Sequence, residues 1–236
     1  MSFREKNYSI IKGAVSNELA QFCCDYFLLK EKVADTLFKE KFISPYSHIH
    51  GIFGDTQVNN AFACYADLAM ETLLVKTLPK VEESTGLKLY PTYSYARVYR
   101  RGSLLKRHID RFSCQISTTL FLGGSKWPIY IDSESNNKEI SYDQNGNYIP
   151  RNKEGVEINL EQGDMLLYKG SEYEHWRDGL NGDHCVQVFL HYNIQGSTNE
   201  ITGVGSQVGL KSENNIFDGR PHLGLPVYFK KNKWVN

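Results

Sequence analysis

From residue 87 onward, the sequence consists of short segments rich in β-branched and aromatic residues, separated by turn residues. Branched and aromatic side chains pack well on a pleated surface, so such segments favour strands. The turn signals recur at close intervals: Gly123-Gly124, Asn136-Asn137, Asn145-Gly146, Gly155 and Gly163. Short strands joined by turns of this kind predict a β sandwich or jelly roll.

The first 88 residues have a different periodicity. Ser16 or Asn17 can cap a helix that continues to about Lys32, because apolar residues recur at helical spacing from Leu19 onward. A second helical pattern covers residues 60 to 78; Pro79 interrupts it, and a further turn or two brings the chain to Gly86, a good C-cap. We expect these helices to pack on one sheet, which makes the fold mainly β with flanking helices (α+β).

At 236 residues the chain is long enough for one domain with a full core, and β folds of this size are commonly single units. We expect a single domain, residues 1–236, made of a helical N-terminal support over 1–88, a β core over 89–195 and a C-terminal extension over 196–236. The extension is rich in Gly, Ser, Thr and Asn, and we expect it to wrap the domain or to contribute to a lid or a subunit contact. The oligomeric state stays open.

The charges are balanced, with 27 Lys and Arg against 27 Asp and Glu. No overall charge therefore attracts nucleic acid or an anionic membrane. The N-terminus has no apolar run typical of a signal peptide, and no segment approaches the ~20 apolar residues of a membrane span. We expect a soluble, cytoplasmic protein without nucleic-acid or membrane partners. Its five cysteines are odd in number and lack Cys-x-x-Cys spacing, so we expect reduced core thiols.

The triplet His108-Ile109-Asp110 is the strongest candidate for chemistry. Residues i and i+2 of a strand point the same way, so His108 and Asp110 can present a nitrogen and an oxygen to one point. Downstream, His175 follows a Gly-Asp turn and an apolar run, and it is the candidate for a third ligand. Two histidines and one carboxylate on one face are the ligands expected of mononuclear non-haem Fe(II) oxygenases.

The residues around the triplet follow a wider pattern. Tyr99 is followed three residues later by Gly102, and the His-x-Asp triplet begins six residues after the Gly. A strand rich in Thr and apolar residues follows at 116–122, and a Gly-Asp turn at 163–164 precedes the distal histidine. This pattern resembles the 2-oxoglutarate and Fe(II)-dependent dioxygenases, and within them the prolyl 4-hydroxylase-like branch.

The resemblance covers roughly residues 89 to 195 and implies that this part is a catalytic double-stranded β-helix, or jelly roll. It implies Fe(II) at His108, Asp110 and His175, 2-oxoglutarate as cosubstrate, molecular oxygen, and ascorbate as a candidate reductant. The implied activity is hydroxylation of a C–H bond in a peptidyl substrate, with prolyl as the first guess, or in a small molecule.

One part of the pattern differs here. In the family that the pattern resembles, an Arg or Lys nine or ten residues after the distal histidine usually holds the distal carboxylate of 2-oxoglutarate. In this chain those positions are His184 and Cys185. The alternatives are Arg177, two residues past the proposed ligand, and Arg97, which shares a strand face with Tyr99. Tyr99 is either a hydroxyl donor to the cosubstrate or a core aromatic. Other cations that remain open as anchors are Lys126 and Lys169.

Two other functions fit the sequence. One is a non-catalytic jelly-roll module that binds sugar or peptide, in which His-x-Asp is structural. The other is a cupin-like metalloenzyme that does not use 2-oxoglutarate. His48 and His50 alternate like a metal pair, but they lie in an expected loop without a carboxylate, so we interpret them as solvated or substrate-facing. Gln115, Ser117 and Thr119 share a strand face, on which they would bind cosubstrate or line a polar part of the cavity.

Overall fold

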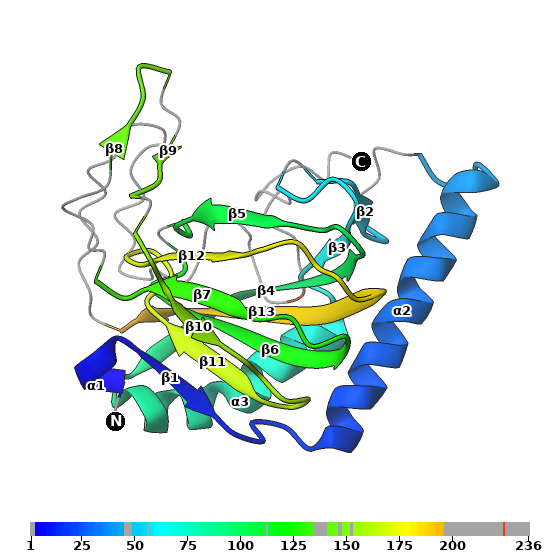
Figure 1. The fold of residues 1–236 in the computed structure, drawn as a ribbon. Coiled ribbons are helices and arrows are strands. Elements are labelled where there is room, and N and C mark those ends of the chain that lie inside the picture. The colour runs from blue at the N-terminus through cyan, green and yellow to red at the C-terminus, as the bar shows by residue number, and fades with distance from the viewer. Residues whose placement is uncertain are drawn as a thin grey trace, which may run out of the picture.

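The computed structural model describes residues 3–44, 49–55, 57–111, 113–134, 141–145, 148–151, 153–195 and Gly224. Within these residues the strands form two main antiparallel sheets, with two long helices beside one of them (Figure 1). The C-terminal extension expected over 196–236 lies outside the described residues, apart from Gly224. No helix in the described ranges is long and apolar enough to cross a membrane.

The larger sheet has seven strands from distant parts of the chain. In spatial order they are β1 (Tyr8–Ile11), β11 (Met165–Tyr168), β6 (Ile116–Gly124), β13 (His184–Ile194), β4 (Leu89–Arg100), β3 (Phe62–Tyr65) and β2 (Ile52–Phe53). The central strand β13 pairs with β4 on one side and β6 on the other. The first 88 residues therefore supply strands to this sheet as well as the expected helices.

The smaller sheet has four strands and carries the proposed histidine ligands. In spatial order they are β10 (Val156–Ile158), β7 (Ile129–Asp132), β12 (Glu174–Arg177) and β5 (Leu105–His108). It lies over the larger sheet, and a two-stranded ribbon of β8 (Ser141–Tyr142) and β9 (Tyr148–Ile149) projects beyond it (Figure 1). Phe121 and Leu166 of the larger sheet belong to one buried cluster with Ile129 and Ile131 of the smaller. Two such facing sheets form the jelly roll that the sequence predicts.

The two long helices begin at recognisable caps. The helices are α1 (Phe3–Lys6), α2 (Asn17–Lys39) and α3 (Leu68–Thr85). The Ser16 hydroxyl accepts a hydrogen bond from the first turn of α2, as expected, but this helix continues well past residue 32. Asp67 caps the start of α3 in the same way, and α3 ends at Gly86 in the left-handed conformation with φ 69°. Glycine adopts this conformation readily, which explains the stop.

Two expectations for this part of the chain were wrong. The helical pattern that begins at residue 60 gives strand β3 first, because these residues pair with β4 instead. Pairing partners decide strand formation more strongly than local propensity does. Pro79 does not interrupt α3, which continues to Thr85. Its missing N–H would have bonded the carbonyl of Val75, whose residue is 48% exposed, so water can solvate the freed carbonyl.

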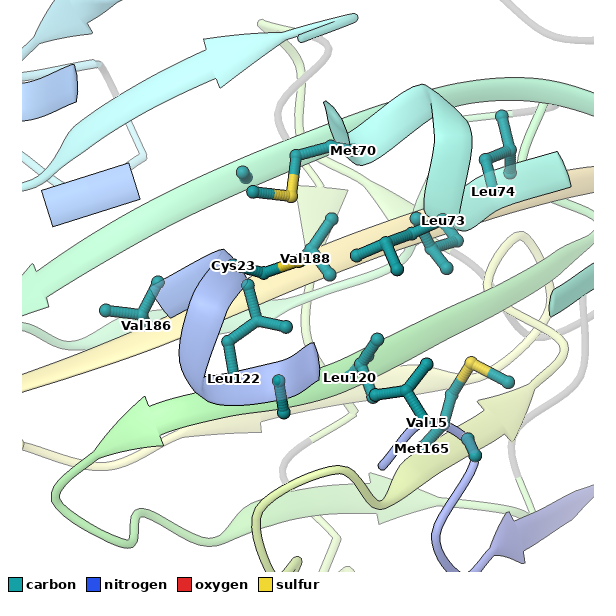
Figure 2. Close-up of a cluster of buried hydrophobic side chains, with 14 of the residues drawn as sticks. Val15, Cys23, Met70, Leu73, Leu74, Leu120, Leu122, Met165, Val186 and Val188 are labelled. Carbon is teal, nitrogen blue, oxygen red and sulfur yellow. The ribbon is translucent and has the colours of Figure 1, made fainter. Parts of the chain in front are cut away.

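Both long helices pack on the face of the larger sheet that points away from the smaller one (Figure 1). Figure 2 shows the side chains at this interface. They come from the helices, the strands and the chain before α2: Val15, Cys23, Met70, Leu73, Leu74, Leu120, Leu122, Met165, Val186 and Val188. The five cysteines are all buried free thiols, as predicted. With the helices covering the outer face, the inner face of the sheet is left to form a site.

Candidate metal centre

Three side chains converge at the edge of the smaller sheet. His108 ends β5, Asp110 follows two residues later, and His175 on β12 lies directly opposite His108 in the antiparallel pairing. Asp110 Oδ1 lies 3.6 Å from His108 Nε2 and 3.4 Å from His175 Nε2. Neighbouring ligands at octahedral positions about 2.1 Å from a metal are roughly 3 Å apart. The three groups therefore fit one ion with a small adjustment.

The backbone orients both imidazoles. His108 Nδ1 lies 2.7 Å from the carbonyl oxygen of Lys106, and His175 Nδ1 lies 3.1 Å from that of Tyr173. A carbonyl can only accept, so each Nδ1 carries the proton and each Nε2 keeps a lone pair. Both lone pairs are then available on the side of Asp110. Metal-binding histidines are commonly oriented by such a second hydrogen bond.

The electrostatics favour the protonation states that a metal requires. Burial, and after it the proximity of His175, lowers the pKa of His108 below its ordinary value of 6.5. Burial alone would raise the pKa of Asp110, but the proximity of His175, and after it that of His108, holds it well below its usual range. At neutral pH the site therefore offers a neutral imidazole at His108 beside a carboxylate at Asp110. These are the forms that bind metals.

The three groups line a cavity of about 190 Å³ between the sheets. Aromatic side chains of the larger sheet dominate its opposite wall: Tyr65, Tyr93, Tyr95, Tyr99, Tyr168 and Phe189. They come from β3, β4, β11 and β13, and strand alternation turns them inward while their neighbours face the helices. The cavity thus has a polar end at the cluster and a mainly aromatic body.

Arg177 is a buried cation beside this site. It is 1% exposed, two residues after His175 on β12. Its guanidinium donates to the carbonyl of Trp127 and, at 3.3 Å, to the hydroxyl of Thr119, while Nε has no partner. Among the residues that the structure describes, no carboxylate lies within 4.0 Å of it. Burial lowers the pKa of Arg177, a sign of a charge without a counter-ion.

Arg97 lines the cavity but already has a counter-ion. It forms an ion pair with Asp55 and is 2% exposed. Its guanidinium also contacts the side-chain oxygen of Gln57 at 3.1 Å and the hydroxyls of Tyr95 and Tyr99 at 2.9 and 3.2 Å. Its charge is therefore largely neutralised from within the protein. Tyr99 lies in this network as well as in the cavity wall, next to the ring of Trp127.

Of the candidate anchors only Arg97 is among the residues that line the cavity; Arg177 lies behind its wall, and His184, Lys126 and Lys169 have other surroundings. His184 alternates with Cys185, which faces the core between the sheets, and the imidazole of His184 lies against Gly124. Lys126 pairs with Glu161 at 2.6 Å, and Lys169 pairs with Glu172 at 3.4 Å. The described residues contain two metal-like groups that share Asp110, one with His108 and His175 and one with Cys114 and His191; His50 belongs to neither, and His48 lies outside the described residues.

Comparison by sequence finds no matching family model and no matching curated protein. By structure, a prolyl-4-hydroxylase from Pseudomonas putida is similar, with TM-score 0.51 and 13% identity over 82% of this chain and 96% of that one. SnoN, a non-haem α-ketoglutarate-dependent epimerase of nogalamycin biosynthesis, has TM-score 0.57 and 10% identity over 80% and 79%. HygX from Streptomyces hygroscopicus, solved with nickel and 2-oxoglutarate, has TM-score 0.51 and 12% identity over 83% of this chain and 86% of that one. This chain has their fold.

Sequence reasoning missed several residues of the site. His191 had no assigned role, yet it lines the cavity, with its ring 4.6 Å from that of Tyr93 and its Nδ1 3.1 Å from Ser117 Oγ. Its position on the inward face of β13 was readable from the alternation with Phe189, but its partner on β6 was not. Asp55, in a segment expected only as a loop, had no sequence signal at all.

Proposed function

We propose that this protein is an Fe(II)- and 2-oxoglutarate-dependent oxygenase that hydroxylates a C–H bond of a peptidyl, for instance prolyl, or small-molecule substrate. The observation that carries the proposal is the cluster of His108, Asp110 and His175, whose ligand atoms lie within 4.8 Å of one another in this fold. Two histidines and a carboxylate on one face leave the opposite coordination positions of the ion open.

The donor set fits Fe(II), since imidazole nitrogen and carboxylate oxygen are ligands that suit this ion. When bound, Fe(II) with 2-oxoglutarate supplies the oxidation, in which decarboxylation to succinate and CO2 accompanies transfer of oxygen from O2 to a C–H bond. The protein's own contribution is positional: the carbonyls of Lys106 and Tyr173 hold the rings in place. The surrounding aromatic side chains exclude water from the reaction.

Arg177 supports 2-oxoglutarate as the cosubstrate. Arg177 lies two positions after His175 on β12, so their Cα atoms are roughly 7 Å apart, a distance that a five-carbon dicarboxylate can span. A bound anion would supply the carboxylate partner that Arg177 lacks among the described residues; an unpaired Nε is common to Arg177 and Arg97 and does not distinguish them. Arg97 is a weaker anchor because Asp55 already neutralises it. The Thr119 hydroxyl accepts a hydrogen bond from Arg177 and donates its proton to Gln187, so it helps to hold the guanidinium in place.

The aromatic wall supports a substrate with apolar rings or aliphatic groups. Tyr65 and Tyr95 are stacked, with ring centroids 4.1 Å apart, and Phe189 lies beside Tyr95. Flat faces of this kind pack against a prolyl ring or an aliphatic side chain and leave the polar end of the cavity for the cosubstrate. The wall serves a peptide side chain and a small molecule equally well.

The first experiment is an anaerobic titration of the Fe(II)-loaded protein with 2-oxoglutarate, followed by absorption. We expect a new visible band on addition of 2-oxoglutarate, and release of succinate after O2 is admitted with ascorbate present. The matched control is His175→Ala, which should give neither. Metal binding without a new band would favour the cupin-like alternative, and an absence of Fe(II) binding would favour the non-catalytic module. Either result would overturn the proposal.

A further inference from the structure

The two oxygens of Asp110 have different surroundings. Oδ1 lies toward the imidazoles, 3.6 Å from His108 Nε2 and 3.4 Å from His175 Nε2. Oδ2 points the other way and accepts a hydrogen bond from the hydroxyl of Ser117 at 2.6 Å. Ser117 belongs to β6 of the larger sheet and is fully buried, so this bond joins the two sheets. The carboxylate is therefore held in one orientation, with a single oxygen available to an ion.

His191 fixes the direction of the Ser117 hydroxyl. A serine hydroxyl has one proton, and here it goes to Asp110, so Ser117 Oγ accepts from any further donor. That donor is His191 Nδ1, 3.1 Å away on β13. The ring of Tyr93 packs against His191 with centroids 4.6 Å apart. A directed chain of hydrogen bonds thus runs from the imidazole through the hydroxyl to the carboxylate.

Gly170 leaves the space in which this chain forms. It follows β11 and is buried, and its carbonyl accepts the backbone N–H of Asp110 at 2.8 Å. A Cβ placed on Gly170 would overlap Ser117 Oγ and Asp110 Oδ2 at once. Its backbone is not in the left-handed region, so the missing side chain, and not an unusual φ, is what the site requires. The side chain of Asp110 can meet Ser117 only where this position has no Cβ.

We propose that Gly170, Ser117 and His191 form a positioning device that keeps Asp110 a one-oxygen metal ligand. The inference rests on the proposed function, because it concerns the same ion. When Ser117 holds Oδ2, this oxygen cannot turn onto the ion and occupy a position that the cosubstrate or O2 needs. Partners of metal ligands commonly act in this way, and their loss weakens metal binding about 10- to 100-fold.

The first test compares Ser117→Ala with Ser113→Ala, using Co(II) alone as the probe. Both serines are fully buried, but the Ser113 hydroxyl has no hydrogen-bond partner among the described residues, so its removal is a matched control. We expect Ser117→Ala to bind Co(II) about 10-fold more weakly. We also expect altered visible bands of Co(II), since the freed Oδ2 can join Oδ1 on the ion. Ser113→Ala should keep the wild-type affinity and spectrum.

The second test compares Gly170→Ala with Gly179→Ala. A Cβ on Gly179 meets no atom within 4 Å, whereas one on Gly170 displaces the Asp110 carboxylate. We expect Gly170→Ala to lose about 100-fold or more in Co(II) affinity, and Gly179→Ala to match the wild type. Circular dichroism and thermal melting check that each variant is folded, and Ser117→Ala decides the matter if Gly170→Ala is not.

The outcomes separate this inference from the proposed function. If the wild-type protein does not bind Co(II), the metal site itself is refuted and the inference with it. If the wild type binds Co(II), and Ser117→Ala shows the same affinity and the same bands, the metal site stands and the positioning device is refuted.

Discussion

Arg97 on β4 forms an ion pair with Asp55, which lies in the connection between β2 and β3. Both residues are largely buried, and Tyr95 also donates its hydroxyl to the same carboxylate. The pair closes one side of the cavity and links the N-terminal part of the chain to the core. It also leaves Arg177 as the buried guanidinium without a carboxylate in the described part of the site.

Asp55→Ala should destabilise the protein by about 3 kcal/mol, because it leaves the Arg97 guanidinium buried without its counter-ion. Urea denaturation at neutral pH measures this. The control is Asp183→Ala, which removes a pair with Arg101 at 2.6 Å whose side chains are 85% and 67% exposed. Such an exposed pair contributes about 0–1 kcal/mol. Equal losses in the two variants would refute the role of burial.

Arg177→Met should separate cosubstrate binding from stability. The substitution removes two hydrogen bonds but also a buried charge without a counter-ion, so the free energy of unfolding of the metal-free protein should change by less than about 1 kcal/mol. Affinity for 2-oxoglutarate, measured by calorimetry on the Ni(II)-loaded protein, should fall about 100-fold, since charge-assisted hydrogen bonds contribute about 1.5–3 kcal/mol. Arg177→Lys should fall between. If Arg177→Met binds 2-oxoglutarate as tightly as the wild type, another cation must hold its distal carboxylate.

The stability of the metal-free protein should decrease in mild acid. The pKa of His108 is lowered in the fold by burial, so between its ordinary value of 6.5 and its lower folded value the unfolded chain binds a proton that the folded one does not. As the pH falls through 6.5, the free energy of unfolding therefore decreases, and this group contributes at most about 1.4 kcal/mol per pH unit to the decrease. Urea denaturation after metal chelation measures the slope, which should be shallower in His108→Gln. An identical slope would contradict this assignment.

Pro79→Ala should stabilise the protein by about 2 kcal/mol, because it restores an N–H within an exposed stretch of helix. Pro79 is not among the residues that line the cavity, so metal affinity should not change. Thermal melting monitored by circular dichroism at the helical signal provides the measurement. A lower melting temperature would contradict the prediction.

The sequence predicted those features of the fold that depend on local pattern. Strand periodicity after residue 87, the cap at Ser16 and the stop at Gly86 each depend on neighbouring residues, and each is found in the structure. The partner of a strand is not a local property, which is why β3 was mistaken for helix. His108 and Asp110 lie close together as predicted, although Asp110 is two residues beyond the end of β5 and not in the strand, and the pairing of β12 with β5 brings His175 there.

The rest of the site depends on contacts between residues distant in sequence. Ser117 and His191 lie 74 positions apart and meet because β6 and β13 are neighbours. No sequence pattern marked Gly170, because the site requires only that this position has no side chain, and the side chains that need the space come from distant parts of the sequence. The preference for Arg177 over Arg97 as the proposed anchor depends in the same way on Asp55, because this carboxylate pairs with Arg97.

The proposed ligands come from the smaller sheet or the turn that leaves it, whereas the aromatic wall is built by the larger one. Substitutions at Tyr65 or Phe189 can therefore reshape what the cavity accepts without disturbing the strands that would hold the ion. Under the proposed function, substitutions in the larger sheet would change the substrate, while the smaller sheet would keep the ligands of the ion in place. The hydrogen bond between Asp110 and Ser117 joins the two sheets, so substitutions near Ser117 would still affect the proposed ligands.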